Sequence, residues 1–152
     1  MTREQMLEEK VDLIADADRL RHYRPQAARL LDEKAAVLER RIAEEEFAAG
    51  NEQWVIPAIS SASCYMLAGN YQEARDVCRF ILDRQPKPRI VEEVARLIAD
   101  IDNRELLVQQ ASRSVLAIPV EDAAVIGEQC ARLEEQLLPT PFNPMLDLVG
   151  CV

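Results

Sequence analysis

The sequence predicts an all-α protein, and three observations support this. Only four glycines occur in 152 residues, so few positions favour a break inside a helix. No stretch alternates apolar and polar residues over the length of a strand. Apolar residues recur instead at spacings of three and four, which places them on one face of a helix. We therefore expect antiparallel helix hairpins, about seven helices in all, stacked as a right-handed superhelix or as a compact bundle.

The first two helices are expected to form an N-terminal hairpin over residues 3–49. In the first helix, residues 3–20, one face carries Met6, Val11, Ile14 and Leu20. Pro25 suits the first turn of the second helix, where its missing N–H has no helical partner to lose. That helix carries an apolar seam and ends near Phe47, before Gly50; the seam comprises Leu31, Ala35, Leu38 and Ile42.

The remaining helices are separated by glycine and proline. A third helix is expected before Gly69, with Pro57 in its first turn, and a fourth over residues 71–84. Pro86 and Pro88 end the fourth helix and start a fifth at residue 89. Asp102 either caps a sixth helix over residues 104–116 or lies inside a continuous fifth one. A last helix is expected over residues 119–138, which makes residues 1–138 one helical domain, followed by a Pro-rich extended tail over residues 139–152.

Composition and charge restrict the possible partners. The chain is 49% apolar, which is enough to build a core at this length. Its formal charge of −9 would repel the phosphates of nucleic acids and anionic lipids. No apolar run approaches the roughly 20 residues needed to cross a bilayer. We therefore expect a cytoplasmic protein that binds neither nucleic acid nor membranes.

The residues that carry catalytic and metal chemistry are sparse. Four cysteines occur without a CxxC pair, and the only histidine is His22, so no metal site is expected. Cys64 and Cys78 are expected to face inward as reduced thiols. The sequence has no glycine-rich phosphate loop, GxSxG elbow or HExxH motif, and its neighbouring glutamates would point apart on helices. We expect no catalytic activity, no metal and no cofactor.

Residues 55–88 carry a pattern of small, aromatic and turn residues. Ala62 stands where two helices would approach closely, Gly69 lies in the turn between them, and Pro86 closes the pattern; Tyr65, Tyr71 and Ala74 fill its remaining positions. This stretch resembles one tetratricopeptide repeat, a helical hairpin of about 34 residues. Ala58 and Ser61 stand where the family usually has larger apolar residues, and Ile81 replaces a usual alanine.

The resemblance implies a peptide-binding groove on the third helix. The positions that line the groove of such repeats correspond to Ile56, Ile59, Ser63, Met66 and Leu67. Ile59 and Ser63 stand at two places where family members use lysine or asparagine to hold a terminal carboxylate, so the resemblance implies an apolar ligand instead. Alternatively, other helices cover these residues as ordinary core, with Ser63 bonded to its own helix.

Two further segments are candidates for partner contacts. Arg21 and Arg24 belong to a basic patch after the first helix, which either receives acidic residues of a partner or pairs locally with Asp16, Asp18 and Asp32. In the tail, Phe142, Leu146 and Leu148 are apolar residues among prolines. These residues suggest a docking peptide that packs on its own domain, on a second copy or on another protein.

Together these features predict an interaction protein. We expect an adaptor or a dedicated chaperone that holds an apolar segment of another protein or peptide. The alternative is a structural or scaffold subunit that forms a homo-oligomer through its C-terminal tail or the seam of its second helix. An open groove favours the first hypothesis, and an exposed seam favours the second.

Overall fold

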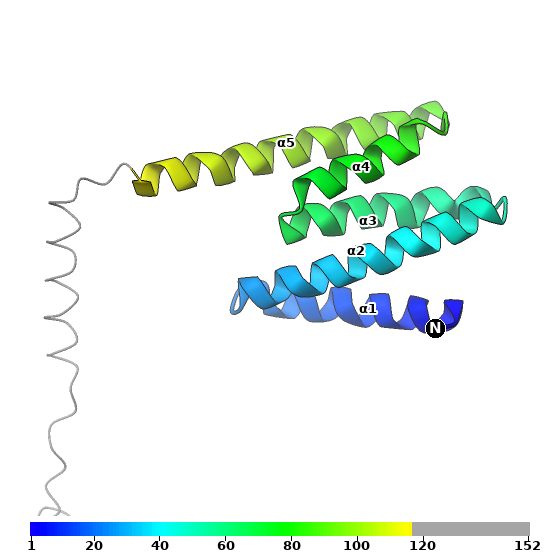
Figure 1. Ribbon diagram of the computed structural model, residues 1–152, viewed down its shortest axis with the longest axis horizontal. Coiled ribbons are helices and arrows are strands. Elements are labelled where there is room, and N and C mark those ends of the chain that lie inside the picture. The colour runs from blue at the N-terminus through cyan, green and yellow to red at the C-terminus, as the bar shows by residue number, and fades with distance from the viewer. Residues whose placement is uncertain (117–152) are drawn as a thin grey trace, which may run out of the picture. The chain divides into compact units, whose positions relative to one another are not determined.

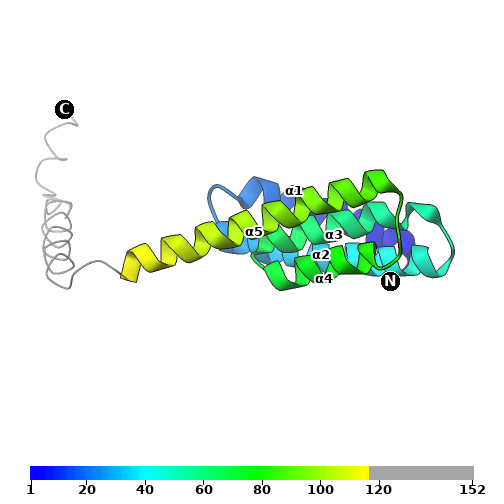
Figure 2. The same ribbon diagram turned by 90° about the horizontal axis from the view of Figure 1, so that it is seen from above.

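A computed structural model describes residues 1–116, all in helices and connecting turns, with no strand in this range. Successive helices run in opposite directions (Figure 1) and lie along a roughly common axis (Figure 2). The elements are α1 (Arg3–Leu20), α2 (Pro25–Ala48), the 3-10 turn η1 (Glu52–Trp54), α3 (Val55–Ala68), α4 (Tyr71–Leu82) and α5 (Pro88–Leu116). The all-helical prediction is confirmed for the described residues.

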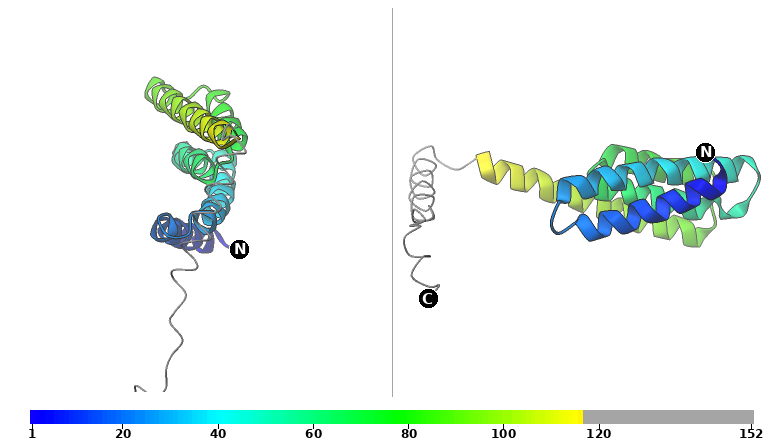
Figure 3. Two further views of the ribbon diagram at one scale, coloured as in Figure 1. Left: turned by 90° about the vertical axis from the view of Figure 1, so that its left-hand side faces the viewer. Right: turned by 90° about the horizontal axis from the view of Figure 1, so that it is seen from below.

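In the first compact unit, Met1–Gln110, the helices from α1 to α4 pack mainly on their neighbours in sequence. α1 packs on α2, α2 on α3, and α3 on α4. In the end-on view, α2 and α4 lie on one side and α3 on the other, and α5 begins on the side of α3 (Figure 3). The last described residues of α5, 111–116, belong to a second unit.

Local sequence signals set the helix ends. Thr2 accepts a hydrogen bond from the Gln5 backbone N–H, and the Gln5 side chain accepts one from that of Thr2, which forms a capping box at α1. Gly50 and Gly69 end α2 and α3 with φ of 73° and 86°, a left-handed conformation that favours glycine. A Cβ at Gly69 would meet no atom within 4 Å. The backbone angle alone therefore requires glycine there.

Small residues allow α2 and α3 to approach closely. Ala36 and Ala43 of α2 are buried, as are Ala58 and Ala62 of α3. The buried Ser61 hydroxyl donates a 2.8 Å hydrogen bond to the Ala36 carbonyl, so this polar group is satisfied within the interface. Ala58 and Ser61 therefore suit this interface, although they are smaller than the residues usual in tetratricopeptide repeats.

The apolar core continues from this interface into α4 and α5. It includes Cys64 and Cys78, which are buried free thiols, as the sequence predicts. Burial raises the pKa of each thiol to about 11. The members contributed by α4 and α5 are Ala74, Val77, Cys78, Ile81, Val94, Leu97 and Ile101.

The contact between α1 and α2 is unusually polar. Asp32, Glu39 and Glu46 recur every seven residues on α2 and are all buried. Each pairs with a cation from α1 or its C-terminal end: Asp32 with Arg21, Glu39 with Lys10, and Glu46 with Arg3. Lys10 Nζ lies 2.9 Å from both Glu39 carboxylate oxygens. We call these three pairs the α1–α2 ion-pair ladder.

One expectation about α1 is wrong, one of the two alternatives for α5 holds, and other expectations lie outside the described residues. Val11 is 59% exposed rather than on the inner face of α1, because the buried positions at that contact are Met6 and Ala17. α5 continues through Asp102, whose carboxylate accepts hydrogen bonds from Arg75 of α4 instead of capping a new helix. Five α-helices are therefore present in the described part, and the expected helix over residues 119–138 and the tail lie outside it.

No helix in the described residues has the length and apolar character to span a membrane.

Candidate partner-binding site

The five groove residues predicted on α3 differ in exposure. Ile56 is 68% exposed, whereas Ile59, Ser63, Met66 and Leu67 are half-buried. Ile59 and Met66 pack against the core, and the Ser63 hydroxyl donates a 3.0 Å hydrogen bond to the Ile59 carbonyl. Much of this face is therefore used within the fold, and Ile56 presents the largest free apolar surface of the set.

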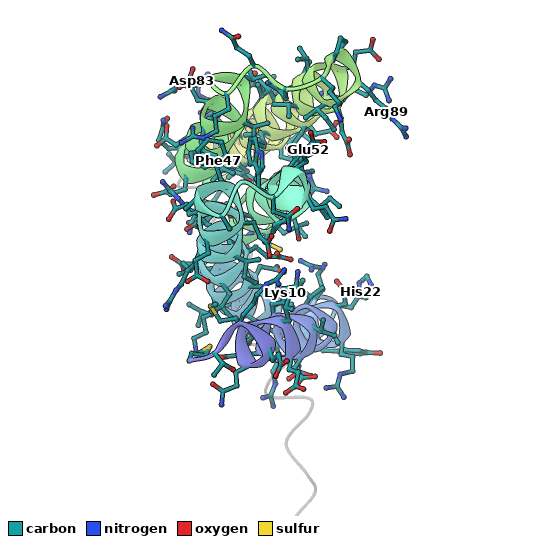
Figure 4. All side chains as sticks on the ribbon, turned by 90° about the vertical axis from the view of Figure 1, so that its right-hand side faces the viewer. Lys10, His22, Phe47, Glu52, Asp83 and Arg89 are labelled. Atoms are coloured by element: carbon teal, nitrogen blue, oxygen red, sulfur yellow. The ribbon has the colours of Figure 1, made fainter. Side chains whose placement is uncertain are left out.

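Ile56 lies beside a pocket of about 420 Å³, formed by η1, the start of α3 and the α4–α5 connection. Figure 4 views this end of the helices, with Phe47 and Glu52 marking the end of α2 and η1, and Asp83 and Arg89 the two ends of the connection. The apolar lining residues are Trp54, Val55, Ile56, Pro86 and Ile90. The polar lining residues are Glu52, Gln53, Arg84, Gln85 and Lys87. We call this the Trp54 pocket.

An aromatic cluster supports one wall of the Trp54 pocket. Phe47, Trp54 and Phe80 pack edge to face, with ring centroids 5.3 to 6.3 Å apart. The Arg84 guanidinium carbon lies 3.5 Å from the Phe80 ring centroid and 4.5 Å from that of Phe47. These cation–π contacts, together with a 2.8 Å hydrogen bond from Nη1 to the Phe80 carbonyl, fix the Arg84 side chain.

The α4–α5 connection forms the opposite wall with restricted backbone angles. Gln85 has a φ of 48°, which is uncommon for a residue other than glycine. Pro86 and Pro88 fix their own φ. Lys87 Nζ lies 3.0 Å from a Glu52 carboxylate oxygen, and both side chains are largely exposed. The two prolines therefore limit the backbone angles that this wall of the pocket can adopt.

The predicted basic patch is partly used within the fold. Arg21 donates hydrogen bonds of 2.8 and 3.2 Å to the two Asp32 oxygens and one of 2.9 Å to Asp18. These bonds raise the pKa of Arg21 further above its already high value. The local pairing that the sequence left open is thus present, and Arg24 alone of the two arginines is exposed.

The remaining predicted features are the C-terminal tail, the absence of a metal site and the apolar seam of α2. Phe142, Leu146 and Leu148 lie outside the described residues. Within residues 1–116, no group of three or more His, Cys, Asp or Glu side chains could hold a metal ion. In the seam of α2, Ala35 and Ile42 are buried while Leu31 and Leu38 are half-buried. The seam therefore lies largely inside the molecule.

Sequence reasoning missed Trp54, Arg84 and Ile90 as members of the pocket. They come from three separate elements and meet only because α3 and α5 begin at the same end of the stack. One signal was available: Trp54 is the only tryptophan in the chain and lies next to the turn at Gly50.

No protein-family model matches the chain, and neither a curated protein nor a solved structure matches it. The resemblance of residues 55–88 to a tetratricopeptide repeat stays a prediction.

Proposed function

We propose that this protein is an interaction adaptor or a dedicated chaperone, in the cytoplasm, that holds an apolar segment of a partner protein at the start of α3. The observation that carries the proposal is the exposed Ile56 in the lining of a largely apolar pocket. Pockets that bind ligands are concave and mainly apolar, with a few polar groups that orient the ligand. The Trp54 pocket has this composition.

The structure changes which residues would carry the contact. Ile59 and Met66 contribute to the core, so charging either of them would disturb the fold as well as binding. Ile56 is exposed and can be changed with little effect on packing. We therefore assign the apolar contact to Ile56 and the Trp54 pocket, and we expect the rest of the α3 face to play a smaller part.

The proposal is tested by selecting phage-displayed random twelve-residue peptides on the immobilised full chain. We expect enrichment of a peptide family rich in large apolar residues. Ile56→Glu should weaken binding of an enriched peptide at least about tenfold, a loss of about 1.4 kcal/mol, without lowering the temperature of thermal unfolding. Fluorescence anisotropy of the labelled peptide measures the affinity.

The matched control is Val37→Glu, since Val37 is an exposed apolar residue of α2 that does not line the pocket. This control should bind the peptide like the unchanged chain. The absence of any enriched peptide family, or equal binding by the Ile56 variant, would overturn the proposal.

A second candidate function is self-assembly as a structural or scaffold subunit. Leu106 and Leu107 of α5 are 52% and 64% exposed, an apolar surface that a second copy could cover. This observation favours α5, rather than the covered seam of α2, as a contact between subunits. The C-terminal tail remains the other candidate contact of this hypothesis.

A further inference from the structure

Arg84 stands apart from the other cations of the described chain. Every other arginine or lysine in residues 1–116 either is exposed or pairs with a carboxylate. Arg84 is half-buried and has no carboxylate within ion-pair distance among these residues. Since burying a charge without a counter-ion is unfavourable, Arg84, whose charge contacts only two aromatic rings and a carbonyl, is the cation of this part of the chain best placed to take a carboxylate from a partner.

The hydrogen bonds of Arg84 lead to the same conclusion. A guanidinium carries five N–H donors, and within the described residues only Nη1 has a bond, to the Phe80 carbonyl. Arg84 Nε is the one buried side-chain nitrogen or oxygen in this part of the chain without a hydrogen-bond partner. Native structures leave few buried donors unpaired, and such a group calls for an explanation.

The surroundings of Arg84 favour an anion attached to an apolar body. The guanidinium is held against two phenylalanine rings and lines the Trp54 pocket beside Trp54, Ile56 and Ile90. The other lining cation, Lys87, already has Glu52 as its partner. The uncompensated positive charge of the pocket is therefore that of Arg84. Arginine binds both carboxylates and phosphates through two parallel hydrogen bonds, and the carboxylate is the one of these two anions that an unmodified polypeptide side chain carries.

We infer that the Trp54 pocket takes a partner segment in which an aspartate or glutamate lies within two residues of a large apolar residue. The carboxylate pairs with Arg84, and the apolar side chain packs on Trp54, Ile56 and Ile90. This inference rests on the proposed function and specifies that the bound segment is acidic as well as apolar. It applies to a polypeptide, because Ile56 also lines a second, neighbouring hollow with Leu7, Ile42 and Pro57, so the surface is longer than one small ligand.

The test begins with the peptides enriched by the full chain in the phage selection. We expect an acidic residue next to a large apolar residue in the enriched family. Trp54 is the only tryptophan and lines the pocket, so its fluorescence reports binding directly. A synthetic enriched peptide should change this fluorescence, and its counterpart with the acidic residue replaced by the corresponding amide should bind about tenfold or more weakly.

The matching changes in the protein are Arg84→Gln and Arg89→Gln. Arg89 is the second residue of α5, is exposed and does not line the pocket. Arg84→Gln should remove the preference for the acidic peptide over its amide counterpart, whereas Arg89→Gln should keep it. The comparison of the two peptides on the unchanged chain decides the question even if Arg84→Gln fails to fold.

The outcomes separate the inference from the proposed function. Enriched peptides that are apolar but not acidic, or equal binding of the acidic and amide peptides, would overturn the inference and leave the proposed function in place. No enriched family would overturn both. A small molecule with a carboxylate on an apolar chain could also fit the pocket, and titration with hexanoate tests this alternative. Binding of hexanoate as tight as that of the peptide would overturn the assignment to a polypeptide.

Discussion

Cys64 and Cys78 show how burial sets the chemistry of single residues in this protein. Both thiols lie in the core. Loss of water around the thiolate raises the pKa of each to about 11, and the charges of Asp32 and Glu39 add to the effect at Cys64. At neutral pH both residues are therefore protonated and poorly nucleophilic. They act as small apolar residues that fill the core.

This burial predicts a loss of stability at alkaline pH. In the unfolded chain the thiols ionise near their ordinary pKa of 9.0, whereas in the folded chain they keep their protons until about pH 11. Between these two pH values the folded state binds more protons than the unfolded state. The contribution of the thiols to the free energy of unfolding is therefore fully present below pH 9 and is lost as the pH rises towards 11. At pH 10.5 the loss should be on the order of 1–2 kcal/mol for each thiol.

Urea unfolding at pH 8 and pH 10.5 measures this loss. A variant with Cys64→Ala and Cys78→Ala should lose less stability between the two pH values than the unchanged chain, although its stability at pH 8 is lower because of the lost side-chain volume. Equal losses in both proteins would show that these thiols do not ionise differently on unfolding.

At the scale of elements, α1 is attached differently from the other helices. Only two of its residues, Met6 and Ala17, are fully buried, Leu13 and Ile14 pack partly on the core, and the α1–α2 ion-pair ladder adds three charged contacts. Removing one partner of a buried pair costs more than the pair contributes, because the other charge stays buried without compensation. The ladder therefore makes the attachment of α1 sensitive to single substitutions.

Lys10→Met should lower the free energy of unfolding by about 3 kcal/mol. The substitution leaves the Glu39 carboxylate, which is 2% exposed, with only the Ser60 hydroxyl as a hydrogen-bond partner. Urea denaturation followed by circular dichroism measures the effect. Adding Glu39→Leu to the same chain should restore most of the stability, because the buried charge is then removed as well.

Arg41→Met provides the comparison, since Arg41 pairs with Glu45 one turn away on the exposed face of α2. Exposed pairs of this kind contribute about 0.5 kcal/mol or less. If Lys10→Met lowers the free energy of unfolding no more than Arg41→Met does, the buried pair does not hold α1 on α2 more strongly than an exposed pair would.

The sequence predicts the elements better than their contacts. Glycine and proline positions place the ends of α2, α3 and α4 to within a few residues, because these two residues act through local backbone angles. Asp102 shows the limit: it looks like a helix cap, and only the contact with Arg75 from another helix explains its role. Arg84 meets Trp54 through such long-range packing, so most of the pocket could not be predicted.

At the scale of the whole molecule, the two hypotheses about function differ in oligomeric state. The core residues all lie in the compact unit Met1–Gln110. An adaptor needs only this unit, together with a partner. A self-assembling subunit needs α5 or the tail as a contact between copies.

Light scattering at several concentrations measures the mass of the full chain and of chains ending at Leu138 and Gln110. Under the adaptor proposal we expect monomers in all three cases, and the chain ending at Gln110 should still unfold cooperatively. A full-length oligomer that becomes monomeric on removal of residues 139–152 would support self-assembly through the tail. An oligomer that persists until residues 111–138 are also removed would place the contact in that segment. An oligomer that persists even in the chain ending at Gln110 would support a contact through Leu106 and Leu107 of α5.

The seven-residue spacing of the ladder has a consequence for design. If α1 were shifted along α2 by one turn, Lys10 and Arg3 would no longer lie opposite Glu39 and Glu46, and two carboxylates would be buried without cations. The ladder thus disfavours an alignment of the hairpin that is shifted by one turn. An engineer could exchange α1 for an unrelated helix and retain the alignment, provided that basic residues recur at positions 3, 10 and 21.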